Sequence, residues 1–95
     1  MNELDKIVFV DSLPKLDLHG YDRESARVAI NDFINENYKL KNKIFVIIHG
    51  RGYGNSVLKL TTAKVLKNNR LVNDYKTYYY NDGCTIVLLN DWPKL

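Results

Sequence analysis

The sequence has little of several things that other classes of protein need. Its 95 residues include one cysteine and two histidines, and no apolar run comes close to the roughly 18 residues of a membrane-spanning helix. A single cysteine, Cys84, excludes an internal disulfide, and one Cys with two His cannot form a structural Cys/His zinc site. Cys84 stands in an apolar run, where we expect a small buried side chain. The first residues also lack the pattern of a signal peptide, so we expect a cytoplasmic protein.

What the sequence does contain is a globular composition with unevenly placed charge. Hydrophobic residues make up 45% and charged residues 26%, which suits one folded domain. The net charge is +3, but residues 1–38 carry −4, residues 39–80 carry +8 and the last fifteen carry −1. A block of one sign indicates a polyanionic partner such as nucleic acid. The alternative is an ordinary solvated helix face.

The most informative stretch is an apolar strand followed by glycines. Ile44 to Ile48 are consecutive large apolar residues, typical of a strand buried on both faces. The glycine loop that follows, residues 50–54, has Gly50, Gly52 and Gly54 at alternate positions, and Asn55-Ser56 could cap the next helix. Exposed amides at a helix N-terminus suit a phosphate, although such turns also serve packing alone. The loop is neither a Walker A motif nor a dinucleotide-binding fingerprint.

A second strand places polar side chains at a corresponding position. In the segment from Leu16 to Gly20, Leu16 and Leu18 alternate with Asp17 and His19, as in a strand with one buried face. A right-handed crossover through one helix would set its carboxyl end beside that of the strand 44–48. Because ligands gather beyond the carboxyl ends of parallel strands, we expect Asp17, His19 and the glycine loop to share one site.

The remaining pattern predicts two helices and a hairpin. A helix over residues 22–39, with Asp22 as N-cap, is expected to serve packing through an apolar stripe of Ala26, Ala29, Ile30, Phe33, Ile34 and Leu40. A second helix is expected over residues 56–68, packing through Leu58, Thr62, Val65 and Leu66. Strands are expected over 75–80 and 84–89, with Asn81-Asp82-Gly83 as the turn between them.

These elements predict an α/β (α+β) two-layer sandwich of order β-α-β-α-β-β, with a mixed four-stranded sheet and two helices. Residues 1–14 would form an N-terminal arm, residues 15–90 the domain and residues 91–95 a tail whose Trp92 packs back onto the body. We expect a monomer.

Four short motifs in this order resemble a known family. Leu-Asp-Leu-His-Gly at 16–20, His-Gly-Arg-Gly at 49–52, the helix with Leu58, Thr62 and Leu66, and the segment from Asp82 to Leu88 are together similar to the small MutS-related (Smr) domain. Thr62, where a valine is usual, and Asn81 to Cys84, where a Gly-Gly-x-Gly-Ala is usual, depart from the pattern. The fold is also similar to the C-terminal domain of translation initiation factor three.

The resemblance implies a nuclease-type domain that nicks DNA or cleaves RNA, in a stand-alone copy. Asp17 would orient His19, which would act as general base or acid. Arg51 and the amides of residues 50–54 would hold the phosphate, and His49 would be a second proton-transfer group or a structural partner of the loop. An RNA 2′-hydroxyl would serve as nucleophile without metal, whereas DNA would require water, activated on a divalent cation (Mg²⁺ or Mn²⁺) near Asp17.

Further basic residues are expected to track the nucleic acid backbone. Lys59, one turn into the second helix, would reach the first phosphate, and Lys43, Lys64 and Lys67 would contact neighbouring ones. One rival hypothesis is a binding module for nucleic acid or the ribosome, in which His19 and His49 only satisfy loop carbonyls. Another is a small-molecule phosphate site, which the large basic block disfavours.

Overall fold

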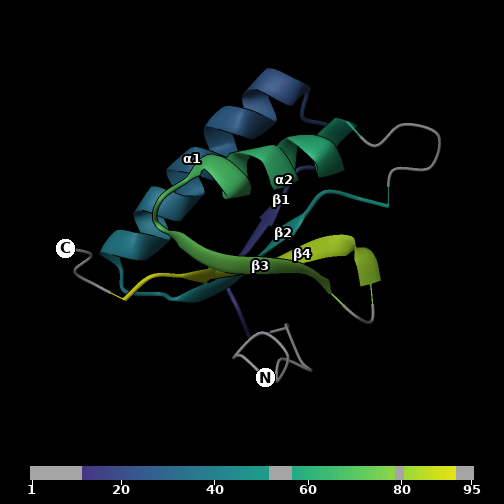
Figure 1. Cartoon of the computed structure of the whole chain (residues 1–95). Coiled ribbons are helices and arrows are strands. Elements are labelled where there is room, and N and C mark those ends of the chain that lie inside the picture. The colour runs from purple at the N-terminus through teal and green to yellow at the C-terminus, as the bar shows by residue number, and fades with distance from the viewer. Residues whose placement is uncertain (1–11, 52–56, 79–80, 92–95) are drawn as a thin grey trace.

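The computed structural model describes residues 12–51, 57–78 and 81–91. In chain order the elements are β1 (Lys15–Asp17), α1 (Arg23–Lys39), β2 (Ile44–Ile48), α2 (Val57–Asn68), β3 (Val72–Tyr78) and β4 (Asn81–Leu89) (Figure 1). This is the predicted order. Most of the expected N-terminal arm, the caps Asn55 and Ser56, and Trp92 lie outside the described residues.

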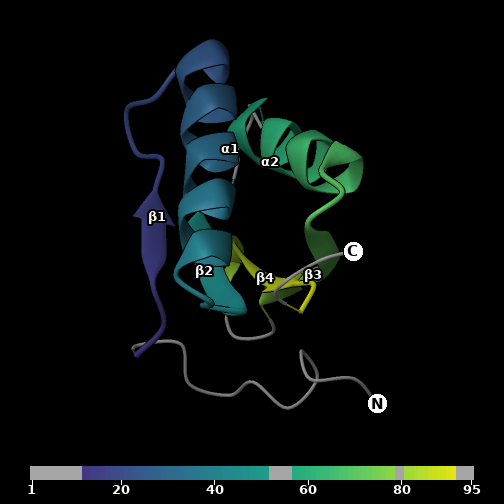
Figure 2. The same ribbon diagram turned by 90° about the vertical axis from the view of Figure 1, so that its left-hand side faces the viewer.

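The four strands form one mixed sheet in the order β1-β2-β4-β3. β1 and β2 are parallel, whereas β4 runs antiparallel to both β2 and β3. Both helices lie on the same face of the sheet (Figures 1 and 2), which gives the predicted two layers. β2 is a central strand, as its unbroken apolar sequence indicates.

The core is divided by the sheet into two clusters. On the helix side, Phe45 and Ile47 pack with apolar residues of both helices, and the Phe45 ring meets Phe33 edge-on with centroids 5.0 Å apart. On the other face, Val46 packs with Ile86 and the predicted buried thiol, Cys84. Alternate residues of β2 therefore enter different clusters, which explains why the strand has no polar face.

α1 begins and ends through local signals. The Asp22 carboxylate accepts the Ser25 N–H at 2.7 Å, which confirms the predicted N-cap, and this bond lowers the pKa of Asp22. Leu40, predicted on the buried stripe, is 63% exposed. That prediction is wrong because Leu40 is the C-cap, and the next residue, Lys41, leaves the helix with φ of 64°.

The predicted hairpin turn is also wrong. Asn81, Asp82 and Gly83 form the start of β4, and Asn81 already pairs with Tyr78. The Gly83 carbonyl accepts N–H groups from the end of β2, so pairing with a distant strand overrides the local turn preference.

Within the described segments, no helix is long and apolar enough to cross a membrane.

Candidate functional site

The carboxyl ends of β1 and β2 lie side by side, as the crossover argument predicts. Asp17 is the register partner of Ile48, and the Leu18 N–H donates to the Ile48 carbonyl at 2.9 Å. Neighbouring strands are about 4.8 Å apart. His19 and Gly50, each two residues beyond this pair, therefore leave the sheet at the same edge.

Asp17 acts on the main chain of His19. Its carboxylate oxygen Oδ1 accepts the His19 N–H at 2.9 Å, which stabilises the turn that follows β1, and Gly20 completes this turn with φ of 83°. Both Asp17 and His19 are exposed. For the His19 imidazole, the described residues provide no hydrogen bond or ion pair. The main chain of His19 is therefore fixed at the strand end, and its ring is exposed to solvent.

His49 has a different environment. Its side chain is 6% exposed, with Nδ1 2.7 Å from the Gly50 carbonyl oxygen and Nε2 2.8 Å from Thr85 Oγ1. A carbonyl can only accept, so Nδ1 carries the hydrogen, and neutral Nε2 accepts the Thr85 hydroxyl. Burial lowers the pKa of His49 and favours this neutral form. Of the two predicted roles, this geometry supports the structural partner of the loop.

Thr85 was missed from the sequence, although a signal was present. It is the lone hydroxyl within the apolar stretch from Cys84 to Leu89, and it is buried. Thr85 pairs with Ile47 across the sheet, which places it on the helix side, where His49 also lies. A single buried hydroxyl in an otherwise apolar strand predicts a polar partner, but the sequence did not indicate which one.

The described part of the glycine loop is bound to the start of β4. The Gly83 carbonyl accepts the N–H groups of His49 at 2.9 Å and Gly50 at 3.0 Å. The Gly50 amide, predicted to bind phosphate, is therefore already used. Arg51 Nε lies 3.2 Å from Asp82 Oδ1. The Arg51 side chain is 50% exposed and the Asp82 side chain 62% exposed. Gly52 and Gly54 lie outside the described residues.

Asp82 is a second residue that the sequence did not single out. Its ion pair keeps the Arg51 guanidinium beside the strand ends, and its charge partly offsets the fall in the pKa of His49. The sequence Asn81-Asp82-Gly83 predicts only a turn residue at this position. Predicting the ion pair between Asp82 and Arg51 would have required the register between β2 and β4.

The predicted lysines are not all at this edge. Lys59 is in the first turn of α2, near enough to His49 for its charge to lower the pKa of the imidazole. Lys64 and Lys67 follow along α2 and are exposed. Lys43 precedes β2 at the opposite end of that strand, where its ammonium pairs with Asp91 at 2.8 Å. It is six residues before His49, or about 20 Å along the strand.

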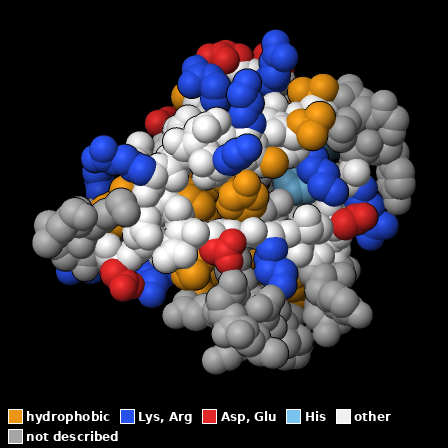
Figure 3. All heavy atoms as spheres, viewed as in Figure 1, with side chains coloured by type: hydrophobic (Ala, Val, Ile, Leu, Met, Phe, Trp, Pro, Cys, Tyr) orange, Lys and Arg blue, Asp and Glu red, His pale blue; other side chains and the backbone are white. Residues whose placement is uncertain are grey.

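Basic side chains gather over the helices on the face shown in Figure 3. The first turn of α2 contains no acidic residue, so the positive end of its dipole is not neutralised locally. Within residues 12–51, 57–78 and 81–91, no three His, Cys, Asp or Glu side chains form a group able to hold a metal ion. A divalent cation near Asp17 remains a prediction.

Comparisons with known proteins agree with the fold and the motifs. Residues 16–90 match the family model described as Smr domain. Endonuclease MutS2 of Caldanaerobacter subterraneus subsp. tengcongensis is 35% identical over 80 residues, which cover 81% of this chain and 10% of that protein. The chain thus spans about a tenth of the length of this curated relative.

Two solved structures share the fold. The stand-alone small MutS-related protein YdaL from Escherichia coli has a TM-score of 0.82 and 23% identity, covering 93% of this chain and 74% of YdaL. The Smr domain of Thermus thermophilus MutS2 has a TM-score of 0.76 and 21% identity, covering 82% of this chain and 99% of that domain. With the family match extending over most of its length, the chain belongs to the Smr domain family.

Proposed function

We propose that this chain binds nucleic acid and cleaves its phosphodiester backbone at the edge where β1, β2 and β4 meet. The observation that carries the proposal is the exposed His19 imidazole just beyond β1, whose neighbouring strand β2 leads to the Arg51 guanidinium. An exposed imidazole can take up and release a proton and can therefore act as general base or acid. The guanidinium supplies charge-assisted donors for a phosphate.

For an RNA substrate, the chemistry needs few groups. His19 takes the proton of the 2′-hydroxyl, whose oxygen attacks the adjacent phosphorus, and the bond to the 5′-oxygen of the next nucleotide breaks. That oxygen leaves with a proton from solvent or from the imidazolium, and the product ends in a 2′,3′-cyclic phosphate. Arg51 stabilises the charge that develops on the phosphoryl oxygens.

The other residues act in support of His19 and Arg51. Asp17 positions His19 through the main-chain N–H, and His49 and Thr85 hold the first residue of the glycine loop against β4. Lys59, Lys64 and Lys67 attract the phosphate backbone without reading sequence. His49 is therefore a positioning residue in this proposal.

A second candidate function is a binding module for nucleic acid or the ribosome. The burial of His49 favours this function. Because the chain has two histidines, only His19 is then left as an exposed imidazole. General acid–base cleavage works best with two groups, one to take a proton and one to give it. A module would use the same basic surface without turnover.

A cleavage assay separates the two. Purified protein is incubated with single-stranded RNA, with the 2′-deoxy strand of the same sequence and with supercoiled plasmid, each in Mg²⁺ and in EDTA. The matched control is His19→Ala, purified in parallel. We expect RNA cleavage in EDTA that leaves cyclic phosphate ends and disappears in the control.

Each other outcome has a meaning. Cleavage of the deoxy strand or plasmid only with Mg²⁺ would replace the RNA mechanism with one based on water and a divalent cation. Cleavage that persists in His19→Ala would remove His19 from the mechanism. Binding of all three substrates without cleavage by wild type would establish the module instead.

A further inference from the structure

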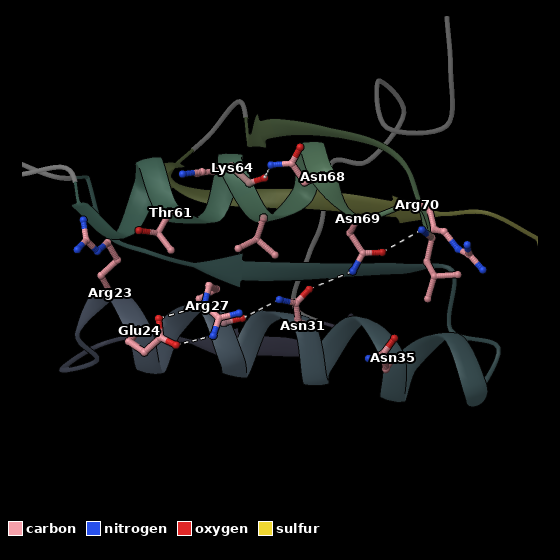
Figure 4. Close-up of a pocket in the computed structure, with 12 residues that line it drawn as sticks. Arg23, Glu24, Arg27, Asn31, Asn35, Thr61, Lys64, Asn68, Asn69 and Arg70 are labelled. Atoms are coloured by element: carbon pink, nitrogen blue, oxygen red, sulfur yellow. Dashed lines mark hydrogen bonds and ion pairs between the residues drawn. The ribbon is translucent and has the colours of Figure 1, made fainter.

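A groove of about 720 Å³ runs between α1 and α2, away from the strand ends that form the candidate site (Figure 4). Its walls carry cationic side chains from both helices and from the segment that follows α2. They are Arg23 and Arg27 of α1, Lys64 of α2, and Arg70. The sequence pattern had indicated that α1 serves packing alone, so the groove is a feature of the assembled helix pair.

The groove carries an excess of positive charge. Against the four cations stands one carboxylate, Glu24, which pairs with Arg27 through both of its oxygens. No carboxylate in the described part of the chain lies within ion-pair distance of Arg23, Lys64 or Arg70. Three cations that line one groove without a carboxylate partner favour an anionic ligand with several charges.

Hydrogen bonds hold the groove in one shape. Asn69 Nδ2 donates to Asn31 Oδ1 at 3.2 Å and so joins α1 to the end of α2. Asn69 Oδ1 accepts the Leu71 N–H at 2.9 Å, and Asn31 Nδ2 donates to the Arg27 carbonyl at 3.2 Å. Figure 4 shows this chain of bonds between the two helices. A site built before its ligand arrives loses less free energy on binding.

The groove begins at the end of the molecule that carries the candidate site. α1 starts after the carboxyl end of β1, and α2 starts after that of β2. In Figure 4, Arg23 and Thr61 lie at one end of the groove, and Asn35 and Arg70 lie at the other. Arg23 and Asn35 are twelve positions apart on α1, or about 18 Å, which spans several phosphates of an extended strand.

We propose that this groove binds the sugar-phosphate backbone of single-stranded nucleic acid and leads the strand to the candidate site. The inference rests on the proposed function for the identity of the ligand. An acidic peptide has similar charge, and arginine clusters also recognise acidic motifs, so polyglutamate is the competing ligand in the test. A peptide that binds as an amphipathic helix would in addition need apolar anchor pockets. Only two lining residues here, Val65 and Leu71, are aliphatic. A duplex is too wide to enter between the helices and would meet the rim alone.

The test measures binding in the His19→Ala protein, so that cleavage does not interfere. Fluorescence anisotropy of a short labelled single strand, as RNA and as DNA, is followed over a range of NaCl concentrations. The groove variant is Arg23→Gln with Arg70→Gln. Two lost phosphate contacts should reduce the salt slope of binding by about 1.4 and lower the affinity at low salt.

Two matched variants sharpen the result. Lys39→Gln with Lys41→Gln removes the same charge from exposed residues outside the groove, and should retain nearly the whole slope. Glu24→Gln removes the carboxylate and releases Arg27, so it should strengthen binding. All of these side chains are exposed, and thermal melts by circular dichroism check that each variant folds.

The proposal is overturned if the groove variant binds like the Lys39/Lys41 control, or if Glu24→Gln weakens binding. It is also overturned if neither strand binds, if a duplex shows the same dependence on Arg23 and Arg70, or if polyglutamate binds more tightly through these arginines. If the groove variants show no effect on binding, the groove proposal fails, but any cleavage observed with the wild-type protein still supports the nuclease. Groove-dependent binding by a protein that cleaves nothing leaves the groove in place and removes the nuclease.

Discussion

The His49 imidazole connects two segments that are far apart in the chain. Thr85, 36 residues away, donates its hydroxyl to Nε2, while Nδ1–H donates to the carbonyl of Gly50 next to it. With both ring nitrogens bonded and the ring buried, the neutral form is held and the glycine loop starts from a defined point. The proton-transfer role therefore falls to the exposed His19 in our proposal.

This burial makes the stability of the fold depend on pH. The pKa of His49 lies below its ordinary value of 6.5 in the folded protein. As the pH falls, the unfolded chain takes up this proton first, so the stabilisation is complete above pH 6.5 and is lost as the pH falls toward the folded-state pKa. Urea unfolding at about pH 7.5 and 5.5, above the usual range of carboxylate titration, should show the loss.

Substitution of each histidine in turn tests whether His49 causes this pH dependence of stability. His49→Gln, which cannot titrate, should flatten the difference between the two pH values and be less stable at the higher one. His19→Ala should keep the wild-type pH dependence, because it leaves His49 and its buried environment unchanged. Equal pH dependence in wild type and His49→Gln would contradict this account.

At the scale of elements, the join between β2 and β4 places the loop. Gly83 accepts the N–H groups of His49 and Gly50 through its carbonyl. A Cβ at Gly83 would lie 3.2 Å from the carbonyl carbon of Gly50 and 3.3 Å from the Arg51 nitrogen. Because both neighbours are backbone atoms, they cannot move aside without moving the loop.

Gly83→Ala should therefore destabilise the protein by about 1–3 kcal/mol and reduce cleavage beyond the effect of stability, since Arg51 is displaced. Urea unfolding and the cleavage assay at a temperature well below the melting transition measure the two effects. A Gly83→Ala protein with wild-type stability and activity would show that the close contact is unimportant.

Gly50 offers a contrast at the same join. A Cβ there meets nothing within 4 Å, but φ is 83°. Gly50→Ala should therefore lower the free energy of unfolding only by the strain of a left-handed residue, about 1–2 kcal/mol. Asn tolerates that conformation better than Ala, so Gly50→Asn should recover part of the loss. No such recovery is expected with Asn at Gly83.

At the scale of the whole molecule, the helix-side cluster holds the two layers together. Phe45 is fully buried at the centre of the sheet and contacts the Phe33 ring of α1. Phe45→Ala should cost about 3–5 kcal/mol, a large part of the 5–15 kcal/mol typical of a domain. Denaturant unfolding measures this loss.

The control for Phe45 is a helix residue of similar hydrophobicity at the surface. Leu60 is 66% exposed, so Leu60→Ala should change stability by less than about 0.5 kcal/mol. If the two substitutions cost the same, the layers are not held by this cluster. Nucleic acid binding should survive Leu60→Ala, because the side chain carries no charge.

Much of this arrangement could be predicted from the sequence, for physical reasons. The helices follow from 3.6-residue periodicity, the start of α1 from Asp22, and the central place of β2 from its unbroken apolar run. The handedness of β-α-β crossovers then brings Asp17 and His19 beside Gly50. Errors occurred at Leu40 and at Asn81 to Gly83, where local pattern competed with the end of a helix and with pairing to a distant strand.

Local features of the sequence are enough to predict the order of elements, the Smr domain membership and the edge of the sheet where polar groups gather. These properties depend on local periodicity, on chain handedness and on motifs short enough to read directly. Tertiary contacts instead bury His49 against Thr85, pair Arg51 with Asp82, and pair Lys43 with Asp91. Each depends on strand register or helix packing between segments far apart in the chain, as does the basic groove between α1 and α2.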